Sequence, residues 1–319
     1  MKRVILCIAA LAFAGAVQAQ QYPSRTVRVI VPWPPGQATD LAARVVADRL
    51  SQVLGQPFVA DNRPGAGGQI GTDAVVKAAP DGYTLLAASS GPISIMPVLQ
   101  KIPYDPLKDL SAVSLIVKAP FALVVNPSFP AANAKEFVAL VRANPDKYTF
   151  SSSGTGATAH LFAELFNSLA QLKARHVPYK GTVPALTDIM NGEITYAVET
   201  VAATGAHIKA GRLKTYGVST KQRTAALPDV PPLAEAADID YDAAAWIGYM
   251  APPGTPVEVR RRLAAEIRRM VDAADVKERF QFLGMDPSAS TPEEMATFLR
   301  AEQDRYAKIV RDANIKIEQ

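Results

Sequence analysis

The spacing of hydrophobic residues near the start of the chain changes from that of a strand to that of a helix, and this change recurs through much of the sequence. The β-branched run at 26–31 predicts a buried strand. Four aliphatic residues then recur at helical spacing over 41–50, as in a helix buried along one face. The turn between them, 32–40, is rich in proline and glycine, and Thr39 or Asp40 is the expected N-cap. The stretch therefore predicts a strand, a tight turn and a helix N-terminus.

The same order of strand, small polar turn and helix recurs downstream. Further strands are expected at 58–60, 83–88, 121–126, 148–150, 194–198 and 213–219. Further helices are expected at 69–79, 134–144, 161–169, 183–190, 257–273, 276–283 and 292–313. This alternation predicts an α/β fold with mainly parallel sheets flanked by helices, in which the turns gather at the carboxyl ends of the strands.

The series of strands and helices divides into two lobes. We expect one lobe to combine residues 20–124 with 221–319, and the other to comprise 125–220. The chain would then cross between the lobes near 124–127 and again near 218–220. Two crossings make a hinge, so closure of the lobes on a ligand is the expected motion.

The composition narrows the class of protein. The chain has 319 residues, of which 49% are hydrophobic and 20% charged, with a net charge of +4 and a pI of about 9.0. That is an ordinary balance for a globular protein of about two domains. Basic residues are scattered among acidic ones, and no basic run carries aromatics. We therefore expect no nucleic-acid partner.

Residues 1–19 have the features of a signal peptide. Two basic residues precede a short apolar run, and small residues end at Ala19, so cleavage is expected before Gln20. The apolar run is too short to cross a bilayer, and no later stretch is long and uncharged enough to do so. The only cysteine, Cys7, lies in this segment, so the mature protein would contain none. These features predict a protein exported to the periplasm and not membrane-spanning once mature.

Motifs for cofactors, metals and catalysis are absent from the sequence. The glycines at 65–71 miss the spacing of a dinucleotide fingerprint, and no phosphate-binding loop or nucleophile elbow occurs. The three histidines, His160, His176 and His207, form no zinc-type motif. His160 is expected to cap or pack its helix. We therefore expect no cofactor, no metal and no catalytic residues.

Four small, polar segments are instead suited to an anion, two in each predicted lobe. Small residues let backbone N–H groups approach a carboxylate, and serine and threonine add hydroxyl donors. The candidate ligand-binding residues of the first lobe are Trp33, Pro35, Gly36, Gln37, Thr39, Asp40, Ser89 and Ser90. Those of the second lobe are Ser152, Gly154, Thr155, Gly156, Ala157, Thr158, Tyr179, Gly181 and Glu199. A small carboxylate held from both sides would favour the closed state.

Several motifs resemble those of the Bug-type receptors, the substrate-binding proteins of tripartite tricarboxylate transporters. The similar segments, in order along nearly the whole mature chain, are 32–36 with Asp40, 62–71, 80–85, 152–154 with 160–161, 177–181, 227–231 and 252–256. The resemblance implies a two-lobe, type II-like periplasmic binding fold of the Venus-flytrap kind. It also implies a small carboxylated solute, held largely by backbone groups of the first βα turn and the Ser/Gly turn of the second lobe, often with ordered water.

Two positions depart from the pattern of that family. Gln37 stands where a second glycine is usual, and it fits there if its φ is negative, with its amide as a candidate ligand contact. Glu199 stands where the family often has aspartate or another polar residue. One hypothesis is that Glu199 pairs with an amino or hydroxyl group of the ligand, or repels a second carboxylate. The alternative is a solvated acid at a strand end.

The sequence thus predicts a periplasmic solute receptor without catalysis, acting as a monomer. Its ligand would be a mono- or dicarboxylic acid, a class that includes amino acids and aromatic acids. The receptor would deliver this ligand to the membrane subunits of a tripartite tricarboxylate transporter. The main alternative is a signalling receptor that presents its liganded form to a membrane sensor kinase. An exported hydrolase is a further, less favoured alternative.

Overall fold

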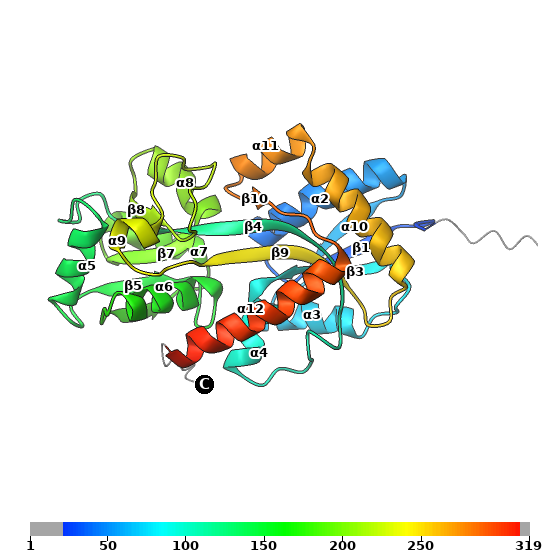
Figure 1. Cartoon of the computed structure of the whole chain (residues 1–319), viewed down its shortest axis with the longest axis horizontal. Helices are drawn as coiled ribbons and strands as arrows, with labels where there is room; N and C mark the ends of the chain where they lie inside the picture. The colour runs from blue at the N-terminus through cyan, green and yellow to red at the C-terminus, as the bar shows by residue number, and fades with distance from the viewer. Residues whose placement is uncertain (1–21, 313–319) are drawn as a thin grey trace, which may run out of the picture.

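The computed structural model describes residues 22–312, in which two groups of helices and strands are joined through the middle by long strands (Figure 1). The first elements are β1 (Val27–Val31), α2 (Ala38–Leu54), β2 (Phe58–Asn62), η2 (Ala66–Gly68), α3 (Gln69–Val76), β3 (Thr84–Ser89), η3 (Gly91–Ile95), α4 (Met96–Leu99) and β4 (Ser111–Val125). The next are α5 (Ala134–Arg142), β5 (Thr149–Ser152), α6 (Thr158–Leu169), β6 (Arg175–Pro178), α7 (Thr182–Asn191), β7 (Tyr196–Thr200), α8 (Val201–Lys209), β8 (Lys214–Val218) and α9 (Leu233–Ala237). The last are β9 (Ala244–Ala251), α10 (Val257–Val271), α11 (Ala274–Phe282), β10 (Asp286–Pro287) and α12 (Pro292–Asp312).

The strands form one mixed sheet in the order β2-β1-β3-β9-β4-β7-β5-β6, with β10 and β8 also paired to β4. The pairings at both outer ends are parallel, as predicted, but those of β4 and β9 in the centre are antiparallel. The expectation of mainly parallel sheets is therefore too simple. The chain enters the second half along β4 and returns along β9, so these neighbours must run in opposite directions.

Strand β4 changes partner in the middle of its length. It pairs with β9 up to Pro120 and with β7 and β8 from Phe121 or Ala122 onward. The return follows Ala243, because Val218 bridges Pro232 and α9 packs against α5 and β8. The crossings expected at 124–127 and 218–220 stay predictions, and these contacts suggest where along β4 and before β9 to look for them.

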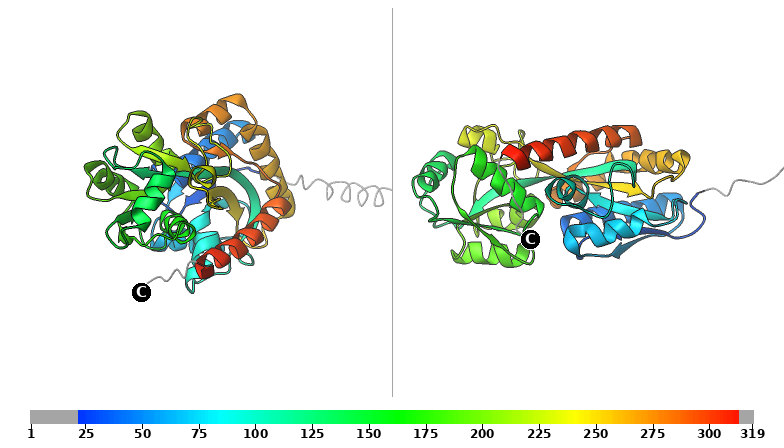
Figure 2. Two further views of the ribbon diagram at one scale, coloured as in Figure 1. Left: turned by 60° about the vertical axis from the view of Figure 1, so that its left-hand side comes forward. Right: turned by 90° about the horizontal axis from the view of Figure 1, so that it is seen from below.

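Helix α12 lies along both halves of the molecule (Figures 1 and 2). Its residues Met295 and Leu299 belong to a core cluster of the first half, with Leu86 and Trp246. Tyr306 belongs to the aromatic core of the second half. The helix has the expected length, but it packs on both halves and so supports the region where they meet.

Two of the sequence-based expectations concern features outside the described residues. The signal peptide and Cys7 lie before residue 22. Within 22–312, no helix combines the length and apolarity needed to cross a membrane. Within the same range, no three His, Cys, Asp or Glu side chains come together as metal ligands would.

Candidate functional site

A cavity of about 720 Å³ lies between the two halves of the structure. Its walls come from the β1–α2 turn, the end of β3, the middle of β4, the start of β9, and the turns that precede α6, α7 and α8. Eleven candidate residues line it, namely Trp33, Pro35, Gly36, Gln37, Thr39, Ser89, Ser90, Ala157, Thr158, Gly181 and Glu199. The sequence therefore located both sides of the cavity.

Six candidate residues are not among those that line the cavity: Asp40, Ser152, Gly154, Thr155, Gly156 and Tyr179. The hydroxyl of Tyr179 donates to Asp188 instead. Several lining residues were not among the candidates: Ser153, Lys180 and Thr182, which lie within the predicted anion-binding segments, and His207, Phe121 and Trp246, which do not. Phe121 and Trp246 lie in apolar strands, where a cavity wall and a core have the same pattern. Lys180 and Thr182 lie inside a segment that the sequence did single out.

The first turn is held by Asp40 from inside the helix. The N-cap of α2 is Gln37, with φ −75°, and not Thr39 or Asp40 as expected. The turn ends earlier because Gly36 adopts φ +83°, which only glycine does without strain, so the helix begins at Ala38. Asp40 Oδ2 accepts from the Gly36 backbone N–H at 2.9 Å. The negative φ of Gln37 meets the condition for that residue to fit, and its side chain is part of the cavity wall.

The carboxylate of Asp40 is buried and takes several donors. Arg44 Nε lies 3.0 Å from both oxygens, and Asn62 Nδ2 donates to Oδ1 at 2.8 Å. Burial alone would raise the pKa of Asp40, but the hydrogen bonds from Arg44, Gly36 and Asn62 lower it overall. Because the pKa is lowered in the folded state, the hydrogen bonds to ionised Asp40 stabilise the fold fully above the unfolded pKa of about 3.9. This stabilisation is lost as the pH falls through the folded value.

Replacing Asp40 by asparagine should therefore destabilise the protein at pH 7. The amide cannot accept from all of these donors, so we expect a loss of about 1–3 kcal/mol in the free energy of unfolding. The difference from wild type should shrink as the pH falls through the lowered pKa of the folded Asp40, because the native carboxylate is then protonated too. Urea unfolding at several pH values measures both effects. Asp48→Asn, an exposed position on the same helix, is the control and should change little.

Tryptophan and serine side chains brace the wall of the first half. Trp33 Nε1 donates to Ser89 Oγ at 2.9 Å, and a side chain at Gly91 would meet the Trp33 ring at 3.2 Å. Ser90 Oγ accepts from the Trp246 backbone N–H at 2.8 Å. Both serines therefore orient cavity-lining aromatic residues, a role that the sequence did not indicate.

The turn of the second half is supported by a pair of stacked histidines. His160 and His176 stack with ring centroids 3.9 Å apart. The Gly156 backbone N–H donates to His160 Nδ1 at 3.1 Å, and Ser152 Oγ lies 2.7 Å from His176 Nε2. Burial, and then the neighbouring His160, lower the pKa of His176 to about 4, so this ring is neutral at pH 7. Of the two expected roles of His160, to cap or to pack its helix, the structure shows packing, and α6 has no side-chain cap.

Glu199 is buried at the end of β7, with only 4% of its surface exposed. Its Oε1 accepts from the Thr200 backbone N–H at 2.7 Å, and its Oε2 accepts from Thr182 Oγ1 at 3.1 Å. Burial raises the pKa of the Glu199 carboxyl, and these two hydrogen bonds oppose that only in part. The alternative of a solvated acid at a strand end is therefore wrong.

Four helices begin at the cavity, namely α2, α6, α7 and α8, and residues of their first turns line it. The first N–H groups of a helix have no acceptor within the helix, and its N-terminus carries partial positive charge. The titratable side chains in the described wall are Lys180, Glu199 and His207. Burial, and then Arg212, lower the pKa of His207. The arrangement can therefore bind an anion mainly through backbone N–H groups.

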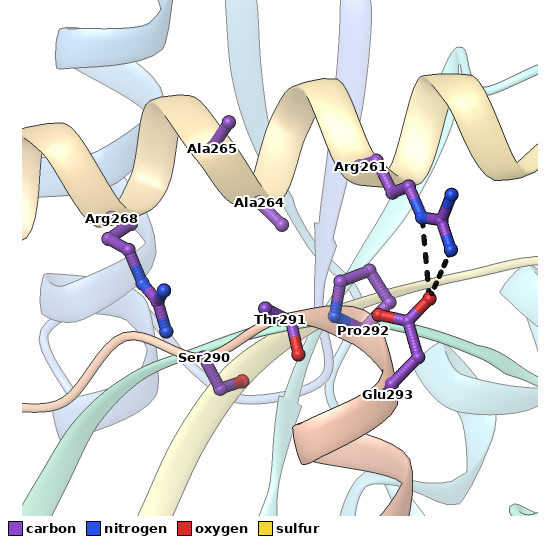
Figure 3. Close-up of a pocket in the computed structure, with 8 residues that line it drawn as sticks. All are labelled: Arg261, Ala264, Ala265, Arg268, Ser290, Thr291, Pro292 and Glu293. Carbon is purple, nitrogen blue, oxygen red and sulfur yellow. Dashed lines mark hydrogen bonds and ion pairs between the residues drawn. The ribbon is translucent and has the colours of Figure 1, made fainter.

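A smaller hollow of about 280 Å³ lies between α10 and the start of α12 (Figure 3). Two arginines border it, but both are engaged by carboxylates. Arg261 lies 2.9 Å from Glu293, and Arg268 lies 3.1 Å from Glu294. These pairs tie the two helices together, so the hollow is not a second anion site.

Comparison with known proteins gives a consistent family likeness. Residues 42–315 match the family described as tripartite tricarboxylate transporter family receptor. Protein BugT from Bordetella pertussis is 37% identical over 312 residues, covering 97% of this chain and 96% of the relative. A curated protein from Pseudomonas sp. strain P51 is 35% identical over 313 residues, covering 97% and 93%.

Solved structures show the same likeness in three dimensions. An R. palustris protein solved with adipate, Rpa4515, superposes with a TM-score of 0.86 at 32% identity, covering 92% of this chain and 99% of its own. MatC from Rhodopseudomonas palustris, with bound malate, superposes with a TM-score of 0.81 at 31% identity, covering 91% and 100%. These neighbours confirm the predicted periplasmic binding fold.

Proposed function

The chain belongs to the tripartite tricarboxylate transporter receptor family, and from that membership we propose that it captures a small carboxylate in the cavity and delivers it to a membrane transporter. The family consists of solute-binding receptors and not of enzymes, so the chain is a receptor. What we propose beyond this is that the ligand is a mono- or dicarboxylic acid and that the transporter is of the tripartite tricarboxylate type.

The observation that carries the proposal is the meeting of four helix N-termini at one cavity. Oriented N–H groups and helix dipoles favour an anion without a fixed cation. The apolar wall residues, including Trp33, Phe121 and Trp246, can cover the carbon skeleton of a small acid. The adipate and malate complexes of two structural neighbours support a carboxylate as the ligand class.

Capture would follow from closure of two lobes about β4 and β9. Wall segments of the first half face those of the second half across the cavity, so a bound ligand would contact both. Contacts made to both lobes exist only in the closed state, which gives the ligand its preference for that state. We place the end of the second lobe near Ala243 and not at 220, on the basis of the packing of α9.

The location and assembly of the receptor are part of the same proposal. We propose that the chain acts in the periplasm after cleavage near Ala19, in line with periplasmic neighbours such as BugD. One copy of the chain supplies both sides of the cavity, which supports a monomer as the functional unit.

A thermal-shift screen of carboxylic acids tests the proposal. A ligand that binds only the folded state at 100 times its Kd should stabilise the protein by about 2.7 kcal/mol. We expect at least one mono- or dicarboxylic acid to raise Tm with this concentration dependence, and neutral sugars to leave it unchanged. Stabilisation by sugars together with none by any acid would overturn the proposal.

A further inference from the structure

The wall of the cavity is asymmetric in charge. Helix N-termini from both halves present N–H donors, whereas Glu199 presents only acceptors when ionised. Lys180, the one lysine in the described wall, is exposed, and Glu199 is buried. The Glu199 carboxyl lies beside the starts of α7 and α8, where it accepts from Thr182 and Thr200, so the N-termini of α2 and α6 are the ones without a neighbouring acid.

The carboxyl group of Glu199 keeps unused acceptor capacity. An ionised carboxylate has about four lone-pair sites, and the described partners are the Thr200 N–H, the Thr182 hydroxyl and the Thr200 side chain, which leaves about one site unused. Both threonines also line the cavity, so the carboxyl lies in its wall and not behind it. Buried acceptors without donors are costly, and a ligand group that donates to them recovers that cost.

We propose that Glu199 selects acids whose far end carries a hydrogen-bond donor, namely an amino, amide or hydroxyl group, over dicarboxylates. The inference rests on the proposed function, because it assumes that a carboxylate binds elsewhere in the same cavity. A second carboxylate beside Glu199 would meet a like charge in a buried setting, or would require an extra proton between the two acids. A donor group meets neither obstacle. Glu199 would therefore select by repelling a second carboxylate as well as by attracting a donor.

His207 is a further wall residue that fits this scheme. Its Nδ1 is buried and has no hydrogen-bond partner among the described residues. His207 lies in the last turn of α8 and Glu199 just before its first, so a polar group elsewhere on a bound ligand could pair with the imidazole independently of Glu199. The far carboxylate of a diacid could accept a hydrogen bond from the imidazole, but that carboxylate would still be repelled by the ionised Glu199.

The test compares acids of equal length on the wild-type protein. The probes are ω-amino, ω-hydroxy, unsubstituted and dicarboxylic acids of four to eight carbons, with Kd measured by calorimetry at pH 7.5. We expect the best ω-amino or ω-hydroxy acid to bind at least tenfold more tightly than the diacid of the same length. In Glu199→Gln this preference should fall about tenfold, because the amide no longer repels and can itself donate. Glu193→Gln, an exposed acid just before β7, is the matched control and should keep the wild-type preference.

The outcomes separate this inference from the proposed function. If acids bind and the diacid is preferred, or if the preference survives Glu199→Gln unchanged, the selection role of Glu199 is wrong and the receptor function stands. If no acid binds the wild-type protein, both fail. The wild-type comparison decides the question even if Glu199→Gln does not fold, which a circular dichroism melt would show.

Discussion

Replacing Gly284 by valine should weaken binding of the best acid from the thermal-shift screen by at least about tenfold. Gly284 lies between α11 and β10 in the first half, and an added Cβ would stand 2.7 Å from the backbone nitrogen of Ala202 in α8. Ala202 and its neighbours Thr200 and Ala203 line the cavity. The larger side chain can be placed only if α8 moves away. Overpacking of this kind costs about 1–3 kcal/mol, and each 1.4 kcal/mol is a factor of ten in Kd.

The control for this variant must carry the same backbone strain. Gly284 has φ +69° and Gly55 has φ +70°, and a Cβ at Gly55 would have no described atom within 4 Å. Gly55→Val should therefore lose a similar amount of stability in urea but keep its Kd within about twofold. Equal Kd values for the two variants would show that the contact between Gly284 and α8 does not set the binding geometry.

The hydrophobic pattern was sufficient for the helices and outer strands but not for the centre of the sheet. The β-branched run of β1 is buried at four of its five residues, and α2 carries a clear spacing of 3.6 because one of its sides is buried. β4 was predicted only from residue 121. Pro120 interrupts it, and a proline normally argues against a central strand. In the structure, Pro120 lies where β4 leaves β9, so the missing N–H falls at the change of partner.

The turns that line the cavity were predicted from the sequence, and the side chains that support them were missed. Turns such as Gly36–Thr39 are visible in the sequence because glycine and proline mark them. The stacking of His160 on His176 depends on strands β5 and β6 lying side by side, which local sequence does not encode. Glu199 was selected through the family resemblance, but its burial depends on packing with α7. Tertiary contacts thus exclude the solvated acid, and a ligand contact of Glu199 stays a prediction.

Replacing Gly156 by valine should abolish the stabilisation of the protein by its acid ligand. Gly156 adopts φ +76°, a conformation in which a β-branched residue is strongly disfavoured, and its N–H is anchored to His160. A valine would force the turn to another path and displace Ser153, Ala157 and Thr158 from the cavity wall. The thermal shift at saturating acid should fall to near zero.

Two further variants test whether the loss of the thermal shift in Gly156→Val comes from the turn before α6. Gly211→Val introduces similar strain, at φ +68°, in an exposed turn between α8 and β8 with no described atom within 4 Å of the added Cβ. It should lower Tm without reducing the ligand-induced shift. Gly156→Asn should retain part of the shift, since asparagine tolerates the left-handed conformation better than valine. If Gly156→Val binds the acid with wild-type affinity, the turn of the second half does not hold the ligand. In that case the carboxylate is held without α6.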